Sequence, residues 1–189
     1  MPEQKNNNET IKYQGKILEI VERVHIVEGK EKVFEMARRA PGTRLIIDLG
    51  NDELLLTKEY RYELNDFDYR LPGGKVYDSL DEYNQALASS EDMEPAITAA
   101  AMKEAKEEVG ITSADAEKFA VSKCGATVDW DLHYYVITNP EIATQNLENG
   151  ENIQLVRVGK EEAKEMCLNG QISEERSAMN LLKYLHLQK

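Results

Sequence analysis

The first third of the chain is dominated by segments in which aliphatic residues cluster or alternate with polar ones, a pattern typical of β-strands. These segments cover 16–27, 32–40, 43–49 and 53–63. Residues that favour turns separate them at 28–29, 41–42 and 50–52. The pattern therefore predicts a β-rich beginning.

The middle of the chain changes character at the segment DYRLPGGKVYD. Pro72 cannot donate to a β-ladder, and Gly73 and Gly74 permit close backbone approaches, so a strand is expected to end in a special loop here. Residues 79–92 are polar and only weakly helical. The clearest helix signal runs over 95–109, with a proline near its start, a run of alanines, and a glycine just after its end.

Further strands are predicted at 118–125, 133–140 and 153–158, followed by helices at 160–170 and 173–187. This order of elements favours an α+β fold with mixed sheets over regular βαβ alternation. The glycine fingerprints of P-loop and dinucleotide-binding folds are both missing from the sequence.

Composition narrows the class of protein. With 189 residues, 41% hydrophobic and 31% charged, the chain can bury one core, or a core and a small lobe. Its apolar runs are shorter than the roughly 18 residues of a membrane span, and its first residues are polar, so we expect a cytoplasmic protein without a membrane partner. Cys124 and Cys167 show no metal-binding spacing and are expected to be free thiols.

The formal charge of −12 argues against nucleic acid as a partner, because binding to phosphates depends on Lys and Arg. An anionic ligand would need a cation to mediate its binding. That requirement directs attention to clusters of carboxylates.

One such cluster lies in the segment KEAKEEVG, where Glu104, Glu107 and Glu108 share one helical face at i, i+3 and i+4. Crowded carboxylates repel one another, and hard cations such as Mg²⁺ prefer oxygen-only clusters of this kind. The alternative is a solvated helix face, on which Lys103 and Lys106 soften the repulsion.

The stretch LPGGKVY followed by AAAMKEAKEEVGI resembles the Nudix box, whose pattern is G-x5-E-x7-R-E-U-x-E-E-x-G-U with U aliphatic. On this resemblance Gly74 takes the opening glycine, Lys103 the arginine, and Glu104, Glu107 and Glu108 the three metal-associated glutamates. The resemblance implies Mg²⁺ as cofactor, with Mn²⁺ as the alternative. Relatives often bind the metal with a backbone carbonyl at the position before the opening glycine, which here is occupied by Gly73.

Two departures from the pattern concern its scaffold. Gly74 precedes Lys103 by 29 residues, where the pattern has 14, so an insertion is predicted at about 78–93. The scaffold glutamate of the pattern is replaced by Pro95, although Glu94 is adjacent and could compensate, and lysine lacks the bidentate geometry of the family's arginine.

The resemblance extends over about residues 14–187, through KEYRYE, GATVDWDLHYYV and GQISEERSAMNLL, to the ADP-ribose and sugar-nucleotide pyrophosphatases of the family. It implies a Nudix-like α/β/α sandwich with a mixed sheet, preceded by a small N-terminal antiparallel sheet, in a homodimer. The predicted organisation is a flexible tail at 1–13, a β-sheet region at 14–56 that relatives exchange between subunits, and a catalytic domain at 57–189.

Four further roles follow from the resemblance, each with an alternative. Glu151, in a loop before a strand, or Glu108 is expected to act as general base, and the alternative for Glu151 is a turn residue. Arg61 would bind a phosphate oxygen of the ligand, or form an ordinary ion pair. Trp130 would stack on the base or ribose, or serve in core or dimer packing.

The predicted function is Mg²⁺-dependent hydrolysis of the pyrophosphate bond in a small nucleotide, ADP-ribose or another nucleoside diphosphate sugar, giving a nucleoside monophosphate and a sugar phosphate. The alternatives are a non-catalytic Nudix-like nucleotide-binding module, and an α+β interaction protein whose acidic helix is only solvated.

Overall fold

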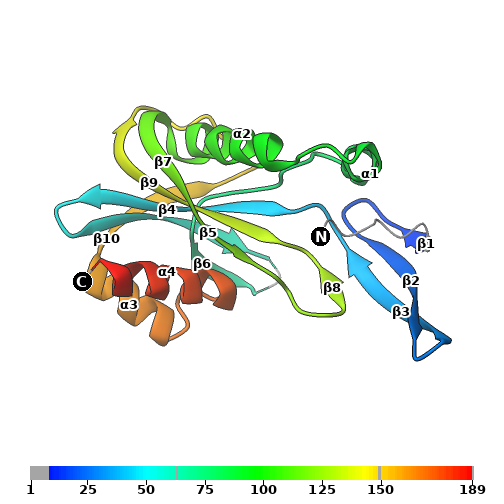
Figure 1. The fold of residues 1–189 in the computed structure, drawn as a ribbon. Helices are drawn as coiled ribbons and strands as arrows, with labels where there is room; N and C mark the ends of the chain where they lie inside the picture. The colour runs from blue at the N-terminus through cyan, green and yellow to red at the C-terminus, as the bar shows by residue number, and fades with distance from the viewer. Residues whose placement is uncertain (1–8, 63, 149, 189) are drawn as a thin grey trace. The chain divides into compact units, whose positions relative to one another are not determined.

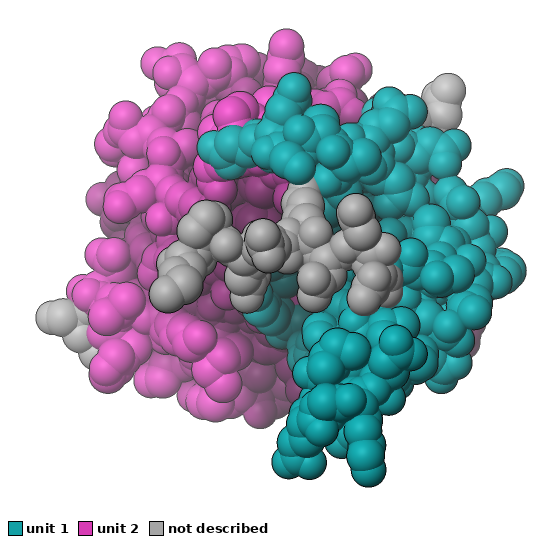
Figure 2. Space-filling view, turned by 45° about the vertical axis from the view of Figure 1, so that its right-hand side comes forward, with its two compact units in different colours: residues 1–41, 77–92, 123–131 teal, residues 42–76, 93–122, 132–189 magenta. Residues whose placement is uncertain are grey.

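The computed structural model describes residues 9–62, 64–148 and 150–188. The chain divides into two compact units, which Figure 2 shows in different colours. The described part of unit 1 comprises residues 9–41, 77–92 and 123–131, and unit 2 contains the remainder.

Unit 1 is built on a four-stranded sheet in the order β1-β2-β3-β8. The strands are β1 (Glu9–Gln14), β2 (Glu19–Val27), β3 (Lys30–Arg38) and β8 (Val128–Asp129). Pairing is antiparallel except between β3 and β8, so the predicted small antiparallel sheet carries one short parallel strand. One helix, α1 (Leu80–Ser89), also belongs to this unit, and the Ser79 side chain caps its first turn.

The domain boundaries differ from the prediction in three respects. Residues 9–13, predicted as part of the tail, lie in β1, because Glu9 forms ion pairs with Arg23 and Arg38 that local composition does not reveal; residues 1–8 lie outside the described residues. Unit 1 takes its first segment only up to Pro41, since the strands after it pair into the second sheet. The segment predicted as an insertion forms α1 and belongs to unit 1, whereas it was predicted within 57–189.

Unit 2 contains a six-stranded mixed sheet in the order β10-β5-β4-β9-β7, with β6 paired to β5. Its strands are β4 (Gly42–Gly50), β5 (Glu53–Arg61), β6 (Asp66–Arg70), β7 (Ile111–Ser122), β9 (Leu132–Ile142) and β10 (Ile153–Gly159). Its helices are α2 (Glu94–Glu104) with the π-helical turn η1 (Ala105–Val109), α3 (Lys160–Leu168) and α4 (Glu175–Leu187). Figure 1 shows α2 over one face of the sheet and α3 and α4 over the other, which confirms the predicted α+β fold and its α/β/α sandwich.

The sheet of unit 2 splits between β4 and β5, and this split positions the glycine loop. These strands pair directly only where 47–50 meets 53–55. Beyond that point β5 pairs with β6, and the segment 72–75 runs beside the first half of β4. The Thr43 N–H donates to the Gly74 carbonyl at 2.9 Å and the Leu45 N–H to the Pro72 carbonyl at 2.8 Å. The Gly73-Gly74 loop is therefore held by the backbone of β4.

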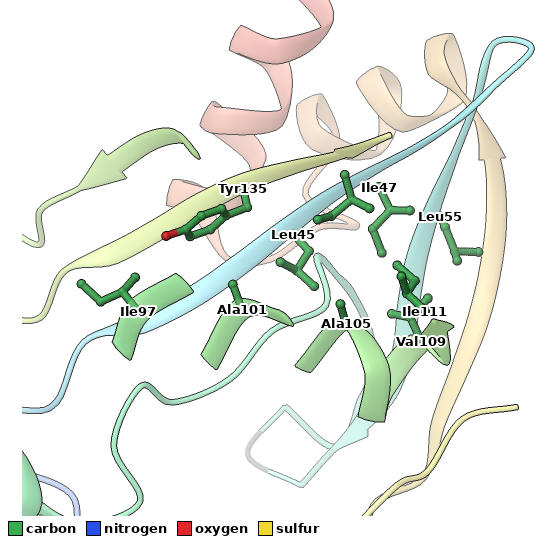
Figure 3. Packing of buried hydrophobic residues seen from close by; sticks show 10 residues of the cluster. Leu45, Ile47, Leu55, Ile97, Ala101, Ala105, Val109, Ile111 and Tyr135 are labelled. Atoms are coloured by element: carbon green, nitrogen blue, oxygen red, sulfur yellow. The ribbon is translucent and has the colours of Figure 1, made fainter. Parts of the chain in front are cut away.

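The core between α2 and the sheet fixes which face of the helix points inward. Residues at a spacing of four along α2 and η1 are buried against the strands (Figure 3); they are Ile97, Ala101, Ala105 and Val109. Ala101 and Ala105 are fully buried, and their small side chains let the helix lie close to the sheet. Glu104 and Glu108 each precede a buried residue, so they lie at the edge of the contact between the helix and the sheet.

Two further sequence predictions are confirmed, the helix before Gly110 and the free cysteines. The helix predicted at 95–109 exists, although its last turn is π-helical, a form often found at functional sites. Both cysteines are free. In the part of the chain that the structure describes, no helix is long and apolar enough to cross a membrane.

Candidate active site around Glu104 and Glu108

Glu108 is tied to the glycine loop. The N–H of Gly73 donates to Glu108 Oε2 at 2.7 Å. Burial raises the pKa of Glu108 to about 8, an effect that the Gly73 hydrogen bond partly offsets and the charge of Glu104 reinforces. This carboxyl group is therefore held in surroundings that disfavour its charged form.

Glu104 lies against the next residue of the loop. A Cβ atom added to Gly74 would come within 2.0 Å of Glu104 Oε1, so the absence of a side chain at Gly74 makes room for the carboxylate. Burial raises the pKa of Glu104 to about 6; the charge of Lys103 opposes this rise and that of Glu107 adds to it. The two glycines and the two glutamates thus form one site.

The remaining residues of the predicted box have other partners. Glu107 lies 3.6 Å from Lys103 Nζ in an ion pair on the same helix. Glu94 binds Lys118 of β7 and accepts a hydrogen bond from the Tyr135 hydroxyl at 3.1 Å. These contacts of Glu94 join the start of α2 to the sheet.

Glu151 is exposed and lies in a turn. Its carboxylate accepts the N–H of Glu148 at 2.9 Å, and its own N–H donates to the Glu148 carbonyl at 3.1 Å. The structure nevertheless brings it near the site, since its charge contributes to the raised pKa of both Glu104 and Glu108.

Gln145, which the sequence analysis did not single out, ties this loop to the site. Its side-chain amide donates to the carbonyls of Glu108 at 2.6 Å and Ile153 at 3.3 Å. The end of η1 and the start of β10 are thereby joined. The sequence around Gln145 contains no pattern that would predict these two hydrogen bonds.

The two residues predicted to bind substrate are placed in different units. Arg61 ends β5 and pairs with Glu59 Oε2 at 3.1 Å. Trp130 lies in unit 1, where the Arg39 guanidinium sits 4.1 Å from the centre of its ring. Neither contact tests a role in binding a ligand.

Arg44 of β4 is a second residue that the sequence analysis missed. Its Nη1 atom donates to the carbonyl of Gly73 at 3.1 Å and to that of Thr43 at 2.7 Å. The Gly73 residue is therefore held on both sides, by Glu108 through its N–H and by Arg44 through its carbonyl. The available signal was an arginine inside the otherwise aliphatic strand TRLIIDL.

Across residues 9–62, 64–148 and 150–188, no three His, Cys, Asp or Glu side chains converge as a group that could hold a metal ion. Of the three predicted glutamates, Glu104 and Glu108 meet at the glycine loop, whereas Glu107 is engaged by Lys103.

No protein-family model and no curated protein matches this sequence. In three dimensions the chain is similar to a solved structure described as "Crystal structure of ADP compounds hydrolase", with a TM-score of 0.71 over 96% of this chain and 94% of that chain. The two share 16% of their residues, so the likeness establishes the fold.

Proposed function

We propose that the chain is a Nudix-type hydrolase that cleaves the pyrophosphate bond of a nucleoside diphosphate sugar, such as ADP-ribose, in the cytoplasm. The observation that carries the proposal is the enclosed pair Glu104 and Glu108 against the Gly73-Gly74 loop. Further support comes from the fold shared with a hydrolase of ADP compounds.

The donor set suits Mg²⁺ or Mn²⁺. Glu104 and Glu108 are oxygen donors whose charged forms are disfavoured by burial and by neighbouring carboxylates, and a cation would relieve both effects. We assign Glu104, Glu107 and Glu108 as metal-binding residues, which requires Glu107 to leave its pairing with Lys103. The Gly73 carbonyl would contribute its second lone pair, because the first accepts from Arg44.

When bound, the cation would neutralise phosphate oxygens and make the attacking water more acidic. Glu151 would accept the proton of that water, with Glu108 as the alternative base. Arg61 would bind a phosphate oxygen and Trp130 would stack on the base or ribose. Attack at phosphorus breaks the bond to the bridging oxygen and yields a nucleoside monophosphate and a sugar phosphate.

One observation favours a second candidate, a nucleotide-binding module without catalysis. Among the described residues the carboxylates do not converge as a metal-binding group. A module of this kind would bind the nucleotide and leave it intact.

The proposed function is tested by incubating the protein with Mg²⁺ and a panel of ADP-ribose, ADP-glucose, GDP-mannose, UDP-glucose and dinucleotides, and separating the products by chromatography. Release of a nucleoside monophosphate and a sugar phosphate, abolished by EDTA, is the expected result. Binding of a compound without turnover in Mg²⁺ or Mn²⁺ would instead support the second candidate.

We also propose a homodimer formed through unit 1. Its sheet exposes large apolar side chains on neighbouring strands, including Ile26, Val33 and Phe34, and exposed apolar patches often mark interfaces. Light scattering should give a mass of twice 21.5 kDa; a monomeric mass would contradict the proposal.

Proton competition should make cation binding depend on pH. Unfolded glutamate titrates near 4.5, whereas Glu104 and Glu108 titrate near 6 and 8 in the fold. Without metal, these two groups therefore remove stability as pH rises through that window, because the folded state holds protons that the unfolded state has released.

A divalent cation needs the ionised carboxylates, so the increase in Tm on adding Mg²⁺ should be large at about pH 9 and small at about pH 5. Scanning calorimetry with and without Mg²⁺ measures the difference. An increase independent of pH would show that the cation binds elsewhere.

Replacing each loop glycine separates its two roles. In Gly74→Ala the three atoms nearest the added carbon belong to the flexible carboxylate end of Glu104, so the carboxylate moves. Mg²⁺ affinity should then fall about tenfold or more with little loss of stability. In Gly73→Ala the carbon would lie 2.2 Å from the Thr43 carbonyl oxygen at a φ of +140°, so the fold itself should lose more than about 1 kcal/mol.

Gly159→Ala is the matched control, because a Cβ there meets nothing within 4 Å. Calorimetric titration with Mg²⁺ and urea unfolding would be applied to all three variants. Equal Mg²⁺ affinity in Gly74→Ala and the control would remove Glu104 from the metal site.

A further inference from the structure

Arg44 occupies an unusual position for an arginine. Alternate residues of a strand share a face, and Asp48, four residues further along β4, accepts a hydrogen bond from Tyr184 of α4. Arg44 therefore lies on the α4 side of the sheet, whereas α2 covers the opposite side. Burial lowers the pKa of Arg44, although its side chain keeps some exposure to solvent.

The hydrogen bonds of Arg44 leave its positive charge without a bound carboxylate. Within the described ranges its hydrogen-bond acceptors are the carbonyls of Thr43 and Gly73, both reached through Nη1. A guanidinium has five N–H donors, so Nε and Nη2 keep donors for another group. An enclosed arginine normally has a carboxylate partner.

The nearby carboxylates already have other donors. Glu108 accepts the Gly73 N–H, and Glu174 accepts from Arg176 Nε at 2.9 Å and from the Ser177 hydroxyl at 2.7 Å. The further arginine close to Arg44, Arg70, is paired with Asp68 at 3.2 Å. Arg176 therefore balances Glu174 and Asp68 balances Arg70, whereas the charges of Glu174 and Glu108 act on Arg44 without a hydrogen bond to it.

A second polar group, the hydroxyl of Tyr134, lies beside Arg44. Tyr134 of β9 is the register partner of Arg44 in the parallel pair of strands, so the two side chains lie next to each other on the same face. Its ring is fully buried. Its hydroxyl lies near that of Ser177, which donates to Glu174, and makes no hydrogen bond of normal geometry among the residues that the structure describes. A guanidinium with unused N–H donors and a neutral hydroxyl therefore lie side by side without a hydrogen bond to a carboxylate.

We propose that Arg44, assisted by the Tyr134 hydroxyl, binds a phosphoryl group of the ligand on the α4 side of the glycine loop. A phosphoryl group would bring negative charge to pair with Arg44 and several oxygens to accept hydrogen bonds from Arg44 and Tyr134. The guanidinium also contacts Gly73, which contacts Glu108, so a phosphoryl group held here lies beside the acidic site. The inference deepens the proposed function and rests on it for the identity of the ligand, a nucleotide with linked phosphates.

The site can be tested without turnover and without metal. Calorimetric titration with inorganic pyrophosphate in EDTA should show binding by the unaltered protein, about tenfold or more weaker in Arg44→Gln and more modestly weaker in Tyr134→Phe. Arg44→Lys keeps the charge and should retain part of the affinity. Arg157→Gln is the control, because Arg157 is an exposed arginine of β10 with only a 3.9 Å contact to Glu53.

Circular dichroism would establish that each variant is folded. Pyrophosphate affinity unchanged in a folded Arg44→Gln, or lowered equally in the Arg157→Gln control, would overturn the site, and so would absence of binding by the unaltered protein. Hydrolysis is assayed separately. If the protein hydrolyses a nucleoside diphosphate sugar but Arg44→Gln binds pyrophosphate as the unaltered protein does, the Arg44 site is refuted and the proposed function stands. Arg44-dependent binding without any turnover would uphold it and refute the hydrolase.

Discussion

Glu108→Gln is expected to lower the turnover of a nucleoside diphosphate sugar by roughly a hundredfold to a thousandfold. Glutamine keeps the shape of the side chain and an acceptor for the Gly73 N–H, but it loses the charge that would hold the cation. Because burial disfavours that charge in the fold, the metal-free variant should be as stable as the unaltered protein or slightly more stable.

Steady-state kinetics and urea unfolding in EDTA would measure the two effects. Glu117→Gln, an exposed glutamate on β7, is the matched control and should change neither. Loss of activity together with loss of stability would point to a structural role for Glu108. Unchanged turnover would remove it from the site.

Arg38→Met is expected to destabilise unit 1 by about 3–5 kcal/mol. Glu19 is fully buried, and one of its oxygens accepts from both Nε and Nη2 of Arg38 at 2.7 and 2.6 Å. Its other oxygen accepts from Asn84 of α1 at 3.1 Å. Without the arginine, a buried carboxylate would lose its counter-charge while tied to the inserted helix.

Urea unfolding followed by the fluorescence of Trp130 would measure this loss, since the only tryptophan of the chain belongs to unit 1. Arg23→Met is the control, because Arg23 pairs with Glu9 at a more exposed position and should contribute less than about 1 kcal/mol. The double variant Glu19→Leu with Arg38→Met should recover much of the stability. If Arg38→Met lowered the free energy of unfolding no more than Arg23→Met does, the buried Glu19–Arg38 pair would not have the predicted effect on stability.

The split sheet explains why the glycine loop and the acidic helix can form a site across the insertion. The loop is held by β4 through Thr43 and Leu45, and the helix is held by the core on its inward face. The chain between them can therefore be lengthened without moving either. The inserted α1 belongs to the other unit, where Asn84 and Asp81 bond to β2 and β1.

The sequence by itself determined the type and order of most elements, because local periodicity and glycine and proline positions encode them. It also singled out Glu104, Glu108 and the loop at Gly73, which lie together in the fold, and their catalytic role stays a prediction. Strand β7 began earlier than predicted, at Ile111, because its polar first half lies on the sheet edge and shows no burial pattern.

Only the tertiary structure decided the rest. Long-range contacts determine the partners of Glu94 and the hydrogen bond between Gly73 and Glu108. They also place β4 in the larger sheet and α1 in unit 1. The same contacts enclose Arg44 beside Tyr134, which are 90 residues apart in the chain. Burial, charge pairing and register are properties of surfaces brought together by folding, and no local pattern of residues contains them.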